Sequence, residues 1–459
     1  MVKYQFQHSN MTFSKDGQLD ELIALDRYSV PTFEGYTKDD TVVAIVDKAM
    51  GTKKVGTITN INDDGTYEII DRLGDKHIVE EKLLQKPLET EPYQLWDRWA
   101  KGGASIEETK ELKEWFENEL RWLFDGYRYS LGGRIQLMLG QEFVTGKKAN
   151  LTAFNCFVIR SPYSFEDSKE QFLDVIKVAF YEASIMRRGG GVGLNISTIN
   201  TVKGSKSFES DFIFYLDKEH ADYEELKDRI LLDKFKGVTV ITEKDEFNKI
   251  VNSKSEHKKV HIINAIDSVD GLFSGIEEMV KDSYDDTVVA INFNDVRERN
   301  AIVKGVNGRS SGAVSWMELF ALVSRLLQQT TIDNVDFAEI FSDIVHLIIQ
   351  GGSRRGALML ICNDDNENVY KFMQRKKTAG YLSGANISVG VSDSFMDKVV
   401  RGRKGENNKE IEEALKLWDI LIESAWSSAE PGIVWLERYN KESNSWYFHK
   451  IIATNPCGN

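Results

Sequence analysis

Apolar and polar residues alternate along residues 41–90, in four segments that read TVVAIV, VGTITNI, YEIID and HIVEEKLL. Turn-forming residues such as DDGT separate the segments. Alternation with a period of two is typical of strands with one buried face and one solvated face. The pattern therefore predicts a small barrel-like β module over 41–90, preceded by an N-terminal extension over 1–40.

The spacing of apolar residues lengthens to a helical period over residues 88–124. Ser105 is followed closely by a pair of glutamates, so we expect it to begin a helix with a capping box. The segment NLTAFNCFVIR, residues 150–160, is rich in β-branched and aromatic residues and predicts a buried strand that carries Cys156. Residues 170–188 predict a further helix.

Residues 205–305 look like an insertion that forms a subdomain. They are acidic and lysine-rich at first, and then contain the strand-like segments GVTVIT, KVHIINAI and TVVAINF. Two apolar helices are expected after the insertion, at 315–329 and 337–350. The segments ALMLIC and GANISVGV predict two more strands.

The composition limits the class of protein. With 459 residues, 41% of them hydrophobic and only six prolines, the chain can bury a large core in two or three structural units. A net charge of −14 argues against a broad nucleic-acid surface. The first residues lack a signal-peptide pattern and no apolar run reaches about 18 residues, so we expect a cytoplasmic protein without membrane contact.

The three cysteines are too few for a disulfide scaffold, which indicates a reducing compartment and cysteine chemistry of a catalytic or redox kind. Cys362 lies in ALMLIC and is expected in the core, and packing alone would account for Cys156. Cys457 lies between Pro456 and Gly458, in a turn where a cysteine is usually exposed or functional. The histidines show no zinc-binding spacing and no CxxC occurs, so no metal site is expected.

Two glycine-rich stretches with paired arginines follow predicted helices, RRGGGVGLN at 187–195 and QGGSRRG at 350–356. Consecutive glycines let backbone N–H groups approach an anion, and the arginines add positive charge, so phosphate contact is one interpretation of each. A close-packed turn is the alternative for the first stretch. A helix C-terminal cap with solvent-facing arginines is the alternative for the second.

Several motifs follow one another along the chain: LGGRI, AFNCFV, RRGGGVGLN, GRSSGAVSWMELF, GGSRRGALML, GANISVGVSDSFM, EPGIVWLERYN and ATNPCG. Together they resemble the catalytic chain of ribonucleotide reductases over about residues 120–458, and more narrowly the adenosylcobalamin-dependent class II enzymes. The insertion is similar to the segment by which monomeric triphosphate reductases replace a dimer partner at the effector site. The resemblance implies an α/β fold, a ten-stranded barrel of two five-stranded halves, with a finger loop that carries a thiyl-radical cysteine.

The resemblance also implies roles for particular residues. Cys457 would be the thiyl residue that takes the ribose 3′ hydrogen, and Cys156 would be one of the two thiols that reduce the 2′ carbon. Asn455 would orient a substrate hydroxyl, because an amide both donates and accepts hydrogen bonds. Backbone around Asn155 and Gly191 would line the substrate pocket. Effector recognition would involve Gln350, Arg354 and Asp167.

The implied ligands are ribonucleoside tri- or diphosphate substrates, dNTP or ATP effectors, and adenosylcobalamin. The insertion favours triphosphates. A thioredoxin-like protein would be the external reductant, and neither nucleic acid nor a membrane is an expected partner.

Two departures from the family pattern change the expectation. The family motif continues as NPCGE, in which the glutamate is the general base for the 3′-hydroxyl proton, but this chain has Asn459, whose amide cannot accept that proton. The second half-barrel and the second redox cysteine have no counterpart in the sequence either. We therefore expect 91–204 and 306–459 to form the first half-barrel of a split or truncated enzyme. It would be inactive until a second polypeptide supplies the C-terminal half-barrel.

Two alternatives to this interpretation stay open. In the first, the same barrel receives its radical from a separate metal-containing subunit and acts on diphosphates. In the second, the chain is a non-catalytic relic that binds dNTPs. The module at 41–90, SH3-like in its strand pattern, lies outside the resemblance.

Overall fold

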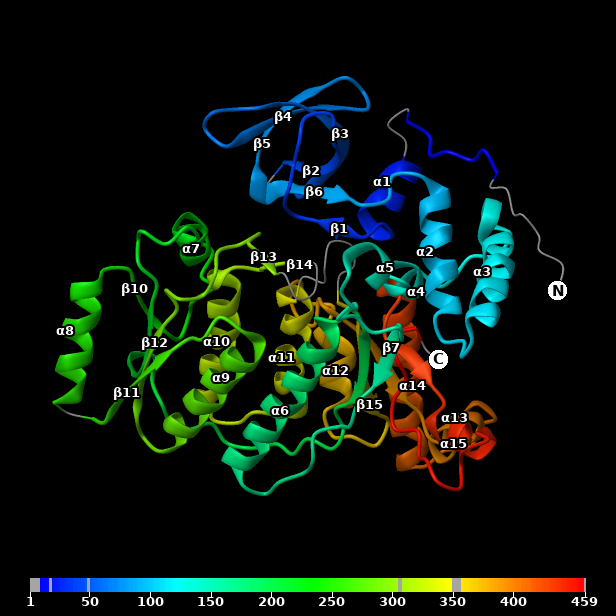
Figure 1. The fold of residues 1–459 in the computed structure, drawn as a ribbon. Helices are drawn as coiled ribbons and strands as arrows, with labels where there is room; N and C mark the ends of the chain where they lie inside the picture. The colour runs from blue at the N-terminus through cyan, green and yellow to red at the C-terminus, as the bar shows by residue number, and fades with distance from the viewer. Residues whose placement is uncertain are drawn as a thin grey trace. The chain divides into compact units, whose positions relative to one another are not determined.

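The computed structural model describes residues 9–15, 19–47, 50–256, 258–303, 308–348 and 356–457 (Figure 1). The chain divides into two compact units. Within the described residues, the first unit comprises those of 1–155 and 300–309, and the second comprises those of 156–299, 310–349 and 355–459.

The first unit contains a six-stranded antiparallel sheet in the order β1-β6-β2-β3-β4-β5. The alternation of apolar residues is visible in its burial, since the residues of β4 alternate between half-buried and buried. Its buried face includes Val42, Ile58 and Ile69. The strands span β1 Pro31–Thr32, β2 Thr41–Asp47, β3 Thr52–Ile61, β4 Thr66–Asp71, β5 Lys76–Glu80 and β6 Leu84–Pro87, and a separate two-stranded sheet pairs β13 Ile302–Val303 with β14 Gly308–Arg309.

Helices complete the first unit: α1 Leu19–Arg27, α2 Pro92–Ala104, α3 Lys110–Phe124, α4 Gly133–Met138 and α5 Glu142–Thr145. The expected capping box at Ser105 is wrong. Helix α2 runs up to Ala104, so Ser105 closes that helix, and its hydroxyl donates to the carbonyl of Gly102 at 2.7 Å. Thr109 is the residue that caps α3, because its side chain accepts a hydrogen bond from the backbone N–H of Leu112.

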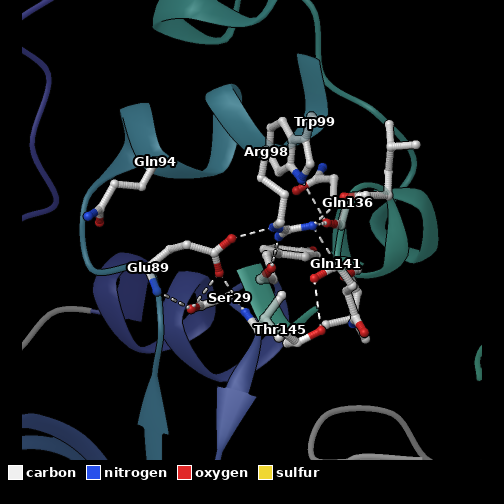
Figure 2. A network of polar contacts seen from close by, with 12 residues as sticks. Ser29, Glu89, Gln94, Arg98, Trp99, Gln136, Gln141 and Thr145 are labelled. Atoms are coloured by element: carbon white, nitrogen blue, oxygen red, sulfur yellow. Dashed lines mark hydrogen bonds and ion pairs between the residues drawn. The ribbon is translucent and has the colours of Figure 1, made fainter. Parts of the chain in front are cut away.

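A buried ion pair ties α2 to the rest of the first unit (Figure 2). The guanidinium of Arg98 is fully buried and pairs with Glu89. The Glu89 carboxylate also accepts from the Ser29 hydroxyl at 3.0 Å and from the Val30 N–H at 2.7 Å. The remaining Arg98 donors bond the backbone carbonyls of Tyr28, Gln136 and Leu139. Every charge in this network therefore has a partner, which a buried ion pair requires.

We expect Arg98→Met to lower the free energy of unfolding of the first unit by about 3 kcal/mol, because it leaves the Glu89 carboxylate buried without its counter-charge. Denaturant titration followed by tryptophan fluorescence measures this loss, since Trp96 and Trp99 are buried beside Arg98. Lys76→Met is the matched control, because Lys76 is 66% exposed in its pair with Glu68. The control should change stability by less than about 0.5 kcal/mol. A loss below about 1 kcal/mol for Arg98→Met would contradict this account.

The second unit contains a five-stranded sheet in the order β17-β16-β15-β8-β7, in which every pairing is parallel. Its strands are β7 Cys156–Val158, β8 Gly191–Asn195, β15 Leu358–Asn363, β16 Ala385–Gly390 and β17 Gly432–Val434. The intervening helices include α6 Ser168–Met186, α10 Ala313–Leu327, α11 Asn334–Leu347, α12 Val369–Arg375, α13 Asp393–Arg403, α14 Lys409–Ser428 and α15 Leu436–Glu442. The predicted α/β class is confirmed.

The sheet is buried on both faces, as parallel sheets are. Along β15, Leu358, Leu360 and Cys362 belong to the large core that also contains α6 and α11. Met359 and Ile361 point the other way and join a smaller cluster with Val434 and Ala453. That second face carries the candidate site.

A second parallel sheet, in the order β10-β9-β12-β11, lies within the predicted insertion. Phe212 and Phe214 of β9 pack into the same core as α10, while Ile213 and Tyr215 face a separate cluster with Phe247. This part of the chain therefore shares its core with the larger sheet. Its elements are β9 Phe212–Tyr215, α7 Tyr223–Leu231, β10 Thr239–Ile241, α8 Lys244–Ser255, β11 Val260–Asn264, α9 Val269–Tyr284 and β12 Val288–Asn292.

The strand predicted over 150–160 is much shorter in the structure. Only Cys156–Val158 forms β7, in register with Gly191, Val192 and Gly193 of β8. Cys156 pairs with Gly191, the residue at which β8 itself begins, so the two strands start at the same limit. The sequence pattern could not show this limit, because the limit is set by the neighbouring strand.

Candidate active site

Glycines in β8 leave room for two other parts of the second unit. A Cβ atom on Gly191 would lie 3.1 Å from the Cys156 Sγ, and one on Gly193 would lie 1.8 Å from the carbonyl oxygen of Thr454. The side-chain-free surface of β8 thus accommodates the Cys156 thiol on one residue and the backbone before Cys457 on another. Packing accounts for these glycines, in agreement with the close-packed alternative for 187–195.

The backbone of residues 451–457, here called the thiol segment, crosses this face of the sheet. Ala453 is 3% exposed and packs with Met359, Ile361 and Val434, and Ile452 packs against the same cluster. Thr454 is also buried, while Cys457 is exposed. Apolar burial therefore anchors the middle of the segment and leaves its cysteine open to reactants.

Two asparagine side chains hold the thiol segment by its backbone. Asn440 of α15 donates to the Ile451 carbonyl at 2.8 Å and accepts from the Ile451 N–H at 2.7 Å. Asn195, at the end of β8, donates to the Ile452 carbonyl at 2.9 Å and to Asn363 Oδ1 at 2.9 Å. Each asparagine is the last residue of a motif quoted above, RRGGGVGLN for Asn195 and EPGIVWLERYN for Asn440, but the motifs alone gave neither side chain a role.

The structure brings together two of the predicted site residues. The Sγ atoms of Cys156 and Cys457 lie 3.9 Å apart, and neither residue is in a disulfide. Asn455, half-buried, lies on the same segment two residues before Cys457, and its Cα is 3.1 Å from where a Gly193 Cβ would be. Two thiols within contact distance, one of them exposed, can exchange electrons or hydrogen atoms with a reactant bound above the sheet.

The third cysteine lies in the core, as predicted. Cys362 is fully buried in β15, and burial raises the pKa of its thiol to about 12. A buried, protonated thiol of this kind is chemically inert. Cys156 and Cys457 are therefore the two thiols left as candidates for the predicted chemistry.

The other predicted site residues have different outcomes. Asn155 directly precedes β7 and is exposed, and Asp167 caps α6 by accepting the Glu170 N–H at 2.9 Å. The predicted roles of Asn155 and Gly191 in substrate binding and of Asp167 in effector binding stay predictions. Outside the described residues lie Gln350, Arg354 and Asn459.

A charged cavity of about 890 Å³ lies elsewhere in the second unit, between α10, α11 and the segment after α12. The side chains that line it include the carboxylates of Glu318, Glu339 and Asp343. Burial raises the pKa of each of them, although Arg229 pairs with Glu318 and Arg375 with Glu339. Among the described side chains, no group of three or more His, Cys, Asp or Glu residues is arranged to hold a metal ion.

Burial, with a contribution from Glu339, raises the pKa of Asp343 to about 7. The folded state therefore binds this proton more tightly than the unfolded chain, in which an aspartate titrates near about 3.9. Stability from this group is complete below about pH 4 and is lost as the pH rises through about 7. The Asp343→Asn variant has no titrating group at this position. As the pH rises from about 5 to about 8, we therefore expect the wild type to lose free energy of unfolding relative to this variant.

Urea titrations at several pH values across this range measure the difference. Asp397→Asn removes a carboxylate that is 63% exposed and serves as the control, whose stability should run parallel to the wild type. A constant offset between Asp343→Asn and the wild type would contradict the expectation.

Comparison with known protein families finds a match over the part of the chain that contains β15, β16 and β17. Residues 325–412 and 403–459 match the model described as ribonucleotide reductase, barrel domain. These residues are therefore similar to the barrel domain of ribonucleotide reductases, and the resemblance drawn from the motifs is confirmed. In the described residues, no helix is long and apolar enough to cross a membrane.

Two named relatives and one solved structure show which ribonucleotide reductases the chain is similar to. The chain is 30% identical over 201 residues to the vitamin B12-dependent ribonucleoside-diphosphate reductase of Thermoplasma acidophilum, covering 42% of this chain and 23% of that relative. It is 24% identical over 299 residues to a putative adenosylcobalamin-dependent ribonucleoside-triphosphate reductase of Mycobacterium phage D29, covering 61% and 40% respectively. A crystal structure of a B12-dependent class II ribonucleotide reductase aligns with a TM-score of 0.46 at 14% identity, covering 70% of this chain and 46% of that one. Each match spans less than half of the relative's length.

Proposed function

We propose that this chain is the catalytic part of an adenosylcobalamin-dependent ribonucleotide reductase, in which Cys457 carries the thiyl radical and Cys156 is one of the two reducing thiols. The observation that carries the proposal is the 3.9 Å approach of these thiols on the face of a parallel sheet, of which β15, β16 and β17 lie in the part of the chain that matches the reductase barrel model. A cysteine on an exposed turn and a second thiol within contact distance suit this chemistry.

In the proposed reaction, the Cys457 sulfur takes the hydrogen atom from C3′ of the ribose and becomes a thiol. The Asn455 amide orients a hydroxyl of the substrate, and the 2′ oxygen leaves as water. Cys156 and a second thiol supply two electrons and two protons and become a disulfide. Cys457 then returns its hydrogen to C3′, which regenerates the thiyl radical. A thioredoxin-like dithiol would reduce the disulfide for the next turnover.

Adenosylcobalamin would supply the unpaired electron through homolysis of its cobalt–carbon bond. The cofactor would have to reach the Cys457 thiol from outside the thiol segment. The chain meets this requirement, because Cys457 is exposed. Both named relatives depend on this cofactor, which favours it over a separate metal-containing subunit. Nothing in the described side chains needs to bind the cobalt for this hydrogen transfer.

The five-stranded sheet supports a proposal about assembly. Within the described residues β7 and β17 are its edge strands, and the edge of a sheet is where a further strand can be added. We propose that a second polypeptide carrying the C-terminal half-barrel completes the sheet. It would also provide the second reducing cysteine and a general base for the 3′-hydroxyl proton. The segment 205–305 would act at the effector site.

Turnover assays test the proposal. The chain would be assayed with and without a co-expressed C-terminal half-barrel, using ribonucleoside di- and triphosphates, a dithiol, adenosylcobalamin and dNTP effectors. We expect deoxyribonucleotide formation that requires adenosylcobalamin and the second polypeptide. Turnover only with a metal-containing subunit, or nucleotide binding without turnover in any combination, would contradict it.

A further inference from the structure

The position of Cys457 relative to Cys156 depends on how the thiol segment is anchored. Burial of Ala453 fixes the segment against the sheet but does not fix its register, because an apolar contact has no direction. Hydrogen bonds to the backbone do have direction. The contacts of Asn440 and Asn195 are therefore the ones that can set the register.

Asn440 contacts Ile451 as a neighbouring strand would, with one donor and one acceptor on the same residue. The amide of Asn440 is itself oriented by a further hydrogen bond, 2.8 Å from its Nδ2 to the carbonyl of Leu436 one turn earlier in α15. An aspartate would keep only the acceptor, and a leucine would keep neither group. The geometry thus requires an amide at this position.

Asn195 contacts the next residue of the segment through a single bond, from its Nδ2 to the Ile452 carbonyl. Its Oδ1 accepts the Ser197 N–H at 2.9 Å, while its Nδ2 bonds Asn363 and Ile452. The side chain is 6% exposed, so water does not compete with these bonds. Consecutive peptide groups of the thiol segment are thereby tied to α15 on one side and to β8 on the other.

We propose that Asn440 and Asn195 are positioning residues that set the register of the thiol segment and hold the Cys457 thiol within reach of Cys156. The catalytic importance of this arrangement rests on the proposed function. The arrangement itself is testable without turnover, because the chain contains a built-in reporter in its two adjacent thiols. Cys362 does not interfere, since it is fully buried.

The test is oxidation of the purified full chain with diamide, followed by peptide mapping of the Cys156–Cys457 disulfide over time. The wild type should form this disulfide readily. Asn440→Leu and Asn195→Leu should form it at least about tenfold more slowly, because a displacement on the order of 1 Å separates reacting groups effectively. Asn252→Leu, on the exposed surface of α8, is the control and should react at the wild-type rate.

Folding of each variant is followed by its denaturant midpoint. Ile451 and Asn440 are only partly buried, so water can replace the lost bonds and Asn440→Leu should stay folded. If a leucine variant does not fold, Asn440→Asp and Asn195→Asp carry the test, and each should slow the disulfide through loss of its donors. Wild-type rates in the folded variants would overturn the proposal.

A second readout links the positioning role to catalysis. In the assembled enzyme, Asn440→Leu should lower kcat while leaving KM within about twofold, because the residue is placed against the thiol segment and not against substrate. Failure of the wild type to reduce nucleotides would reject the proposed function but leave the disulfide result standing. If the asparagine variants form the disulfide at the wild-type rate and turn over normally, only the positioning role is rejected.

Discussion

Cys457→Ser should abolish ribonucleotide reduction by the assembled enzyme, with a loss on the order of 10³-fold or more. A hydroxyl at this position does not form the radical that takes the 3′ hydrogen. Among the described cysteines, only Cys457 has an exposed thiol, so no other thiol replaces it. Steady-state formation of deoxyribonucleotide measures the loss. Binding of substrate and effector should persist, because the substitution exchanges one atom.

The matched control for this variant is Cys362→Ala, which removes the core thiol. Its turnover should stay close to that of the wild type, with a modest loss of stability from the small cavity in the core. Residual turnover above about one per cent in Cys457→Ser would place the radical on another residue. In that case the thiol pair would lose its assigned role.

Gly193→Ala should have the second largest effect. The added Cβ would lie 1.8 Å from the Thr454 carbonyl oxygen and 2.8 Å from its carbon, and both are backbone atoms that no rotamer change can move aside. The thiol segment must therefore shift away from β8. We expect destabilisation of about 4 kcal/mol and a loss of turnover of about 100-fold in whatever folds, since the cysteine is displaced with the segment.

Denaturant unfolding and the rate of the Cys156–Cys457 disulfide measure the two parts of this effect. Gly275→Ala in α9 is the control, because a Cβ there meets its nearest neighbour at an ordinary 3.4 Å. It should stabilise the protein by about 0.5–1 kcal/mol through helix propensity. Unchanged stability and disulfide rate in Gly193→Ala would mean that the segment does not lie against β8.

Local patterns predicted much of the fold. The alternation in VGTITNI and YEIID specifies strands, and β3 and β4 are found there, because a strand with one buried face must alternate. The apolar runs ALMLIC and GANISVGV are β15 and β16, buried on both faces. Long apolar helices such as α10 were equally recognisable. These signals are local, so a single sequence contains them.

Features that depend on distant residues were not predictable. The start of β7 coincides with the start of its partner β8, which lies more than thirty residues further along the chain. Asn195 bonds Asn363 and Ile452, which lie 168 and 257 residues away. The cysteine pair was reached only through the family resemblance, since 301 residues separate the two thiols. Such contacts exist only after the sheet has formed.

Exchange of hydrogen between the 5′ carbon of adenosylcobalamin and solvent is the most direct test of the central claim. The assembled enzyme would be given tritium-labelled adenosylcobalamin and an effector, without substrate, so that only the thiol and the cofactor can react. The account predicts release of tritium to water by the wild type and none by Cys457→Ala. Release that persists in Cys457→Ala, or no release by a wild type that binds the cofactor, would contradict it.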